Sequence, residues 1–130
     1  MRLTHVAVKV GNFRSEDSFT AQFLVDTKAW NSFAPASELR RIGIEPTGKD
    51  VFELVNGQVE ECQYAYVKMA FMEEITATRI IFGPDDIQPL LGVLALQSAG
   101  FLVDPQNKTV RKMLVFPLKT LTSAKIAIAS

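Results

Sequence analysis

Short runs of alternating apolar and polar residues, separated by turn signals, dominate this chain. The clearest turn signal is Asn56-Gly57, which lies between strand-like runs at 51–55 and 59–67. An Asn-Gly pair in this position is the strongest local indication of a β-hairpin. Other strand-like runs cover residues 4–10, 19–25, 68–71, 75–82, 101–103 and 109–116. The pattern predicts an all-β, mostly antiparallel fold, either a small barrel or a sandwich.

Two short helices are expected between these runs. Residues 36–42 place Leu39 and Ile42 on one side, with Gly43 as the stop, and residues 93–99 are followed by Gly100. Residues 32–35 are expected only to lead out of the preceding loop, and Asn31 and Ser32 to be turn residues.

The composition narrows the functional classes. The chain has 130 residues, 48% of them hydrophobic, and a formal net charge of zero, which suits one domain and no nucleic-acid partner. Cys62 and His5 are the single cysteine and the single histidine, so we expect no disulfide, no metal site and no cofactor. The start of the chain does not resemble a signal peptide and no run is long enough to span a membrane. We therefore expect a cytoplasmic protein without a membrane partner.

Residues 1–119 are expected to form the domain. Residues 120–130 read as a C-terminal tail, either disordered or an edge or interface strand open to pairing.

An acid at the end of an apolar strand is the first chemical feature. Residues 23–25 run directly into Asp26-Thr27-Lys28-Ala29. A carboxylate at the edge of a core is costly unless it is used or paired. Asp26 is therefore either a structural residue at a strand end or a working acid, and Asp-Thr alone favours the structural interpretation.

A second motif favours the interpretation of Asp26 as a working acid. Leu90-Leu91-Gly92 opens the second expected helix, and Leu102-Val103-Asp104-Pro105 precedes the last strand. With the Asp26 loop and the hairpin tipped by Asn56-Gly57, this order resembles the retroviral-type (retropepsin-like) aspartic peptidases, in particular small bacterial single-domain members. The likeness extends over about residues 4–119, and its most specific parts are 23–29 and 81–104.

The resemblance implies an acid-protease-type β-barrel, closed or partly open, with one or two short helices. It implies an endopeptidase in which two chains form a homodimer, higher oligomers remaining open, and each chain supplies one catalytic Asp26. The two carboxylates would share a proton and activate a water against a peptide or protein substrate.

The same resemblance assigns roles to the neighbouring residues. Thr27 would hydrogen-bond across the dimer interface, and Thr27, Lys28 and Ala29 would support the active loop. Asn56 and Gly57 would form the tip of a flap over the substrate. Three further residues would pack beneath the loop, with the glycine allowing close backbone approach: Leu90, Leu91 and Gly92.

One position departs from the family pattern, because Lys28 stands where the family has glycine. Its side chain could obstruct a peptide, and its ammonium would favour an ionised Asp26; it could instead extend to solvent. The alternative function is therefore a catalytically impaired peptide-binding or interaction module on the same fold. A third hypothesis is a structural β-barrel whose partner pairs with the tail.

Several residues have ordinary structural interpretations. Trp30, Phe71, Phe82 and Phe116 are expected in the core. Asp104-Pro105 is expected in a hairpin turn. A calcium site around Asp85-Asp86 has no regular ligand spacing to support it.

Overall fold

The structure is a computed structural model that describes residues 4–54 and 56–114. The expectations for the tail at 120–130 and for Phe116 lie outside these residues. Within them the strands are β1 (His5–Gly11), β2 (Ser18–Val25), β3 (Ser32–Pro35), β4 (Gly48–Glu53), β5 (Val59–Phe71), β6 (Glu74–Gly83), β7 (Leu90–Leu91), β8 (Phe101–Asp104) and β9 (Thr109–Lys112). The helices are α1 (Ala36–Arg41) and α2 (Val93–Ser98).

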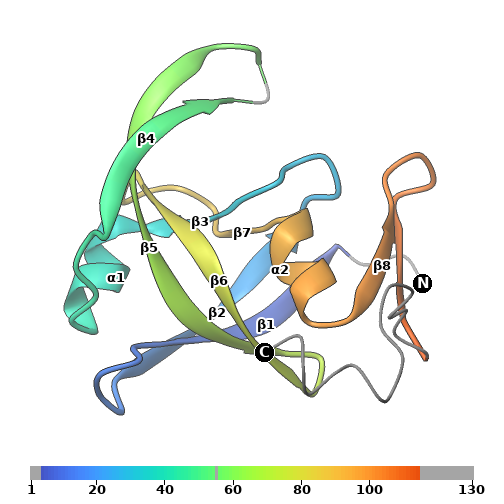
Figure 1. Cartoon of the computed structure of the whole chain (residues 1–130), viewed down its shortest axis with the longest axis horizontal. Helices are drawn as coiled ribbons and strands as arrows, with labels where there is room; N and C mark the ends of the chain where they lie inside the picture. Colours follow the sequence, from blue (N-terminus) through green and yellow to red (C-terminus); the bar gives the residue numbers. More distant parts are fainter. Residues whose placement is uncertain (1–3, 55, 115–130) are drawn as a thin grey trace, which may run out of the picture.

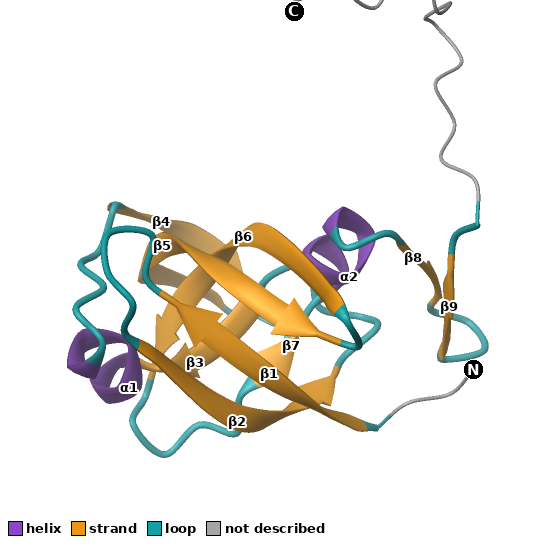
Figure 2. Ribbon diagram, turned by 90° about the horizontal axis from the view of Figure 1, so that it is seen from below, coloured by secondary structure: helices purple, strands orange, loops and turns teal. Residues whose placement is uncertain are grey.

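The main sheet is a ring with one projecting hairpin (Figure 1). Its strand order is β1-β2-β7-β3-β6-β5-β4, and β1 also pairs with β5, which closes the ring and leaves β4 outside it. Most pairings are antiparallel, while β2–β7 and β3–β6 are parallel. Strands β8 and β9 form a separate two-stranded sheet beside α2 (Figure 2). The predicted all-β class with two short helices is confirmed.

Alternation of side chains places the core inside the ring. In β1, Val6, Val8 and Val10 are buried while the residues between them are exposed, as expected of a half-buried strand. Phe23 of β2 and Leu91 of β7 are fully buried in the same cluster. Phe71 and Phe82 are buried as predicted. The Asp26 loop therefore leaves a strand that is anchored in the centre of the molecule.

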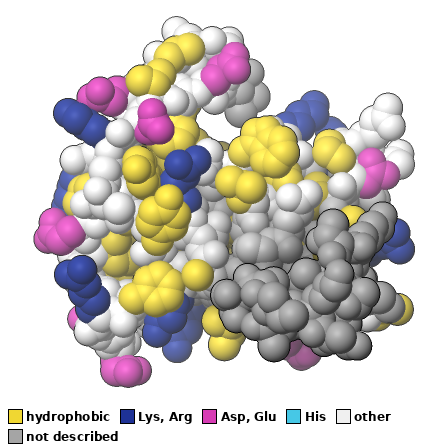
Figure 3. Space-filling model, in the orientation of Figure 1, with side chains coloured by type: hydrophobic (Ala, Val, Ile, Leu, Met, Phe, Trp, Pro, Cys, Tyr) yellow, Lys and Arg dark blue, Asp and Glu magenta, His cyan; other side chains and the backbone are white. Residues whose placement is uncertain are grey.

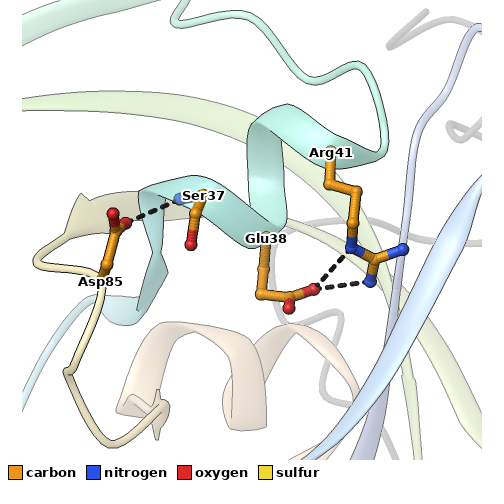
Figure 4. A network of polar contacts seen from close by, with 4 residues as sticks. All are labelled: Ser37, Glu38, Arg41 and Asp85. Carbon is orange, nitrogen blue, oxygen red and sulfur yellow. Dashed lines mark hydrogen bonds and ion pairs between the residues drawn. The ribbon is translucent and has the colours of Figure 1, made fainter.

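Helix α1 is held at both ends by polar contacts (Figure 4). The backbone N–H of Ser37 donates to Asp85 Oδ1 at 3.0 Å, which satisfies an amide of the first turn. Glu38 binds Arg41 one turn later. Gly43 follows the helix with φ +82°, the left-handed conformation expected of a helix stop. Asp85 is thus engaged in capping.

Residues 32–35 form strand β3, and the expectation that they only lead out of a loop is wrong. The segment lies between β7 and β6 and pairs in parallel with β6 from Ser32–Ile80 to Pro35–Gly83. Its partners are about 48 residues away in the sequence, because Ser32 faces Ile80. A parallel pairing of this range has no adjacent turn signal to reveal it.

The predicted C-terminal hairpin is present over the part of the chain that is described. Residues 105–108 form the turn between β8 and β9. The side-chain amide of Asn107 donates to Asp104 Oδ2 at 2.8 Å, and this hydrogen bond, with those from backbone amides, lowers the pKa of Asp104. In the described part of the chain, neither helix has the length and apolar character needed to cross a membrane.

Candidate active site

The carboxyl end of β2 presents Asp26 at the start of a tight loop. The Asp26 side chain is half-buried, and its Oδ1 accepts the backbone N–H of Lys28 at 3.0 Å. The Ala29 N–H donates to the Asp26 carbonyl oxygen at 3.3 Å. An aspartate that accepts a hydrogen bond from an amide two residues later stabilises a turn. The structural role and the chemical role of Asp26 are therefore compatible in this loop.

The loop is attached from behind to β7 and α2. The Asp26 N–H donates to the Leu91 carbonyl oxygen at 3.0 Å. The first amides of α2 point back at the loop: Val93 N–H donates to Ala29 O at 2.8 Å, and Leu94 N–H donates to Trp30 O at 3.0 Å. Helix-end amides lack partners inside the helix, so these bonds satisfy both segments at once. Residues 26 and 90–92, 64 positions apart at the nearest, are thereby brought together.

Gly92 makes this close approach possible. A Cβ at Gly92 would lie 2.6 Å from both the carbonyl carbon and the carbonyl oxygen of Asn31, and 2.7 Å from the Trp30 oxygen. These neighbours are backbone atoms, which cannot rotate away as a flexible side chain would. Only glycine therefore fits between β7 and the loop. Leu91 beside it is fully buried, and Leu90 pairs with both Leu24 and Phe33.

Ser32 is a supporting residue that the sequence analysis assigned only to a turn. It is 1% exposed, and its Oγ accepts the Gly92 N–H at 3.0 Å. This is the one side chain of the loop and β3 that bonds the glycine itself. The signal available in the sequence was a small hydroxyl residue directly before the apolar run Phe33-Ala34-Pro35.

Thr27 and Lys28 have opposite environments. Thr27 is 9% exposed, and within the described residues its hydroxyl forms no hydrogen bond. Lys28 is exposed and forms no ion pair with a carboxylate in that part of the chain. Its φ is not in the left-handed region, which among described non-glycine residues holds only Met72, Glu73 and Lys108. The loop thus accommodates a side chain at position 28 without backbone strain.

A groove of about 730 Å³ runs between the loop and the β4–β5 hairpin. Figure 3 shows hydrophobic side chains gathered below the hairpin. The lining is mostly apolar, and Lys28 and Glu53 are its charged members. Its apolar side chains come from the loop, the hairpin, β3, β6 and the segment that leads into β7: Ala29, Trp30, Phe33, Val51, Phe52, Leu54, Ile81, Ile87 and Leu90. Among the described residues, strand β4 has β5 as its partner in the sheet and no neighbour on the other side, so the groove has one open, extended wall.

Trp30 is part of this groove and not of the core, so its predicted burial is wrong. The side chain is 64% exposed, and Val51 on the hairpin is 59% exposed. The Trp30 carbonyl oxygen accepts the Leu94 N–H of α2, while the ring lies in the groove and not in the core. Large apolar side chains exposed in a groove indicate a contact surface.

The hairpin tip lies at the end of the groove. Gly57 lines the groove and has φ +85°, and its N–H donates to Leu54 O at 2.9 Å. The Asn56 side chain accepts the Gln58 N–H at 2.9 Å. A Cβ at Gly57 would meet no atom within 4 Å. The predicted Asn56-Gly57 turn is confirmed, and the tip is open to solvent.

A second hollow of about 450 Å³ lies on the other side of the loop. It is lined by the residue before β1, by the end of β2 with the loop that follows it, and by the β8–β9 turn: Thr4, Leu24, Val25, Asp26, Thr27, Lys28 and Lys108. Lys28 borders both this hollow and the groove, so the two spaces meet at the loop. Asp26 lines this hollow and not the groove, whereas Gly57 at the hairpin tip lines the groove and not this hollow, so within one chain the hairpin tip and the carboxylate border different spaces.

Arg79 of β6 connects the loop to the hairpin, and the sequence analysis missed it. Its Nε donates to Asn31 Oδ1 at 3.1 Å. Its guanidinium carbon lies 5.2 Å from the ring centroids of both Phe52 and Tyr64. An arginine within an alternating strand carries no signal that distinguishes it from a solvated charge.

Among the described residues no cluster of three or more His, Cys, Asp or Glu side chains could hold a metal ion. The hairpin carries Cys62 on β5, and burial, followed by the nearby Glu60 carboxylate, raises the pKa of that thiol. Comparison with known proteins adds no identity: no family model matches the chain, and no curated protein matches it either.

Proposed function

We propose that this protein is an aspartic-type endopeptidase that works as a homodimer, with Asp26 of each chain in the active centre. One observation carries the proposal. The half-buried Asp26 carboxylate stands in a loop that is bonded from behind to Leu91 and to the first amides of α2, beside an apolar groove under a hairpin. This combination fits the retropepsin-like resemblance of the sequence, including an acid-protease-type barrel for the closed ring.

The chemistry needs two carboxylates, and one chain offers Asp26 alone at this position. A two-fold axis near the loop would bring each Asp26 opposite its own copy. Two adjacent carboxylates share one proton. The ionised one takes a proton from water, whose oxygen attacks the peptide carbonyl carbon, while the protonated one gives its proton to the carbonyl oxygen. Collapse of the tetrahedral intermediate then breaks the C–N bond, as the carboxyl group that took the water proton gives it to the leaving nitrogen and the other carboxylate takes a hydroxyl proton of the intermediate.

The surface around Asp26 suits such a dimer. The hollow beside Asp26 and Thr27 is open, and the Thr27 hydroxyl forms no hydrogen bond within the described part of its own chain. A second copy bound there would bring the two loops together and would supply an acceptor for a hydrogen bond from the Thr27 hydroxyl. In each chain the groove would hold an extended peptide by strand-like pairing with the hairpin and by contacts with Trp30 and Val51.

The test is cleavage of a diverse peptide library at several acidic to neutral pH values, with products located by mass spectrometry. We expect cuts by the wild-type chain that disappear in Asp26→Asn. Asp17→Asn serves as the matched control, because Asp17 is an exposed loop carboxylate that lines neither the groove nor the hollow beside Asp26. The absence of cuts, or cuts shared with Asp26→Asn, such as acid cleavage at Asp104-Pro105, would contradict the proposal.

The second candidate function is peptide binding without hydrolysis, and Lys28 favours it. Lys28 borders both the groove and the Asp26 hollow, where its ammonium would oppose a shared proton. Lys28→Gly keeps the backbone N–H that bonds Asp26 and removes the charge. This hypothesis predicts a wild-type chain that binds peptides without cutting them and a Lys28→Gly variant that cuts. Unchanged activity in Lys28→Gly would show that Lys28 is not inhibitory.

A further inference from the structure

We infer that Arg79 is a positioning residue that holds the β4–β5 hairpin and the Asp26 loop in one arrangement around the groove. The inference rests on the proposed function for its catalytic consequence. The structural part of the inference, that Arg79 links the hairpin to the loop, does not depend on catalysis. The sequence resemblance assigns no role to this residue.

The contacts of Arg79 are divided between the two sides of the groove. On one side, Nε donates to Asn31 Oδ1, and Asn31 is in the loop whose carbonyl groups bind α2. On the other side, the guanidinium lies 5.2 Å from the Phe52 and Tyr64 centroids. Phe52 belongs to β4 and Tyr64 to β5, so both strands of the hairpin are held.

The two aromatic rings that contact Arg79 also pack against each other. Phe52 and Tyr64 pack edge to face with centroids 6.3 Å apart. Gly48, which faces Tyr64 across the β4–β5 pairing, leaves room for the ring, since a Cβ there would lie 3.0 Å from Tyr64 Oη. A planar guanidinium can stack on the rings and donate a directed hydrogen bond at the same time, which a lysine ammonium cannot do.

Two of the Arg79 partners also line the groove. Asn31 and Phe52 face the space where a peptide would lie, while Arg79 itself, half-buried, stands behind them. A peptide that displaces either partner therefore acts on the other through the guanidinium. Arg79 thus sets the distance between the hairpin wall and the loop wall of the groove before any peptide arrives.

The experiment compares amide hydrogen exchange in free wild-type protein, Arg79→Met, Arg79→Lys and Arg40→Met. Methionine keeps much of the apolar stem of arginine and removes the guanidinium. Arg40 is a matched control, since its guanidinium also lies over a ring, that of Phe82 at 5.4 Å, and bonds a β5 side chain, Gln63. Neither of these two Arg40 contacts involves Asn31. Amides of β1 report global unfolding and set the baseline.

In Arg79→Met we expect exchange to accelerate above the β1 baseline at both 28–31 and 48–53. The increase should be at least roughly tenfold, the size of losing one charge-assisted hydrogen bond, and the loss of two cation–π contacts adds to it. Arg79→Lys should restore part of the hairpin protection and little of the loop protection. Arg40→Met should leave the loop unchanged. Unchanged loop exchange in Arg79→Met, or an equal loop effect in Arg40→Met, would overturn the inference.

A kinetic arm adds the catalytic consequence. With a peptide that the wild-type chain cuts, Arg79→Met should raise KM severalfold and leave kcat within about twofold, because the groove loses its set width while Asp26 is untouched. A loss confined to kcat would contradict a positioning role. If no peptide is cut, the proposed function fails, while the exchange experiment still decides whether Arg79 links loop and hairpin.

Discussion

The two walls of the groove are built in contrasting ways. The loop wall is tied to distant parts of the chain by Asp26–Leu91, Val93–Ala29 and Leu94–Trp30 backbone bonds and by the buried Ser32 hydroxyl. The hairpin wall extends outside the closed ring, and its strand β4 is almost entirely exposed or half-buried, with β5 as its partner. Figure 1 shows the hairpin arching above the body of the molecule.

This difference separates two requirements of an enzyme that cuts peptides. In the proposed peptidase, the carboxylate would have to meet its symmetry mate and would need a fixed position, and the bonds of the loop to β7 and α2 suit that requirement. A wall that must admit and cover a substrate needs freedom at its tip, and the tip of the hairpin extends past the Phe52 and Tyr64 contacts with Arg79 into solvent.

The largest contrast is expected between two glycines. Gly92→Ala forces a Cβ against the Asn31 and Trp30 backbone and should lower the free energy of unfolding by about 3 kcal/mol, the upper part of the range for overpacking. Gly57→Ala meets no neighbour and should cost roughly 1 kcal/mol, the price of its positive φ. Urea unfolding of both variants measures the difference. Equal costs would show that the loop is not fixed by close packing.

The next contrast concerns two polar side chains that bind backbone amides. Ser32→Ala leaves the Gly92 N–H without its partner in a buried site, at a cost of about 1–3 kcal/mol. Asn56→Ala removes the exposed bond to the Gln58 N–H, which water replaces, and should cost less than about 1 kcal/mol. Thermal unfolding followed by circular dichroism compares them. A larger loss of stability in Asn56→Ala than in Ser32→Ala would show that the hairpin wall, and not the loop wall, is the more firmly held.

The smallest expected effect concerns the rate at which Cys62 on the hairpin is alkylated. Burial and, secondarily, the Glu60 carboxylate raise the pKa of Cys62, so at a given pH below that pKa the thiolate fraction is smaller and alkylation is slower than for a free thiol. Glu60→Gln removes only the second cause and should lower the pKa of Cys62 in part, speeding alkylation near pH 8. Glu53→Gln is the control on the same hairpin. Slower alkylation of Cys62 in Glu60→Gln would contradict the electrostatic cause.

The sequence predicted the parts of this molecule whose causes are local. The Asn56-Gly57 turn, the helix stop at Gly43 and the alternating strands are encoded within a few neighbouring residues. Strand β3 and the buried role of Ser32 depend on partners about 48 and 60 residues away, and no local pattern identifies them. The prediction for Trp30 is wrong because aromatic residues are usually buried, whereas this ring lines a groove formed with a hairpin that is distant in the sequence.

The candidate site also contains residues that local motifs identify and residues that depend on distant contacts. Asp26 and Leu90-Leu91-Gly92 were recognised as motifs, and the structure brings them into direct contact through the Asp26–Leu91 bond and the Gly92 packing. Arg79 could not be found, since its importance comes from simultaneous contacts with a loop and a hairpin that only folding creates.

The central claim is that Asp26 acts from two chains at once, and subunit mixing tests it most directly. Wild-type and Asp26→Asn chains are mixed at constant total concentration, allowed to exchange, and assayed on one cleaved peptide. With equal amounts of each chain, a shared pair of aspartates predicts about one quarter of the wild-type rate, because only dimers with two intact chains cut. A rate of about one half would show that each chain works alone, and no cleavage by the wild-type chain would show that it is not a peptidase.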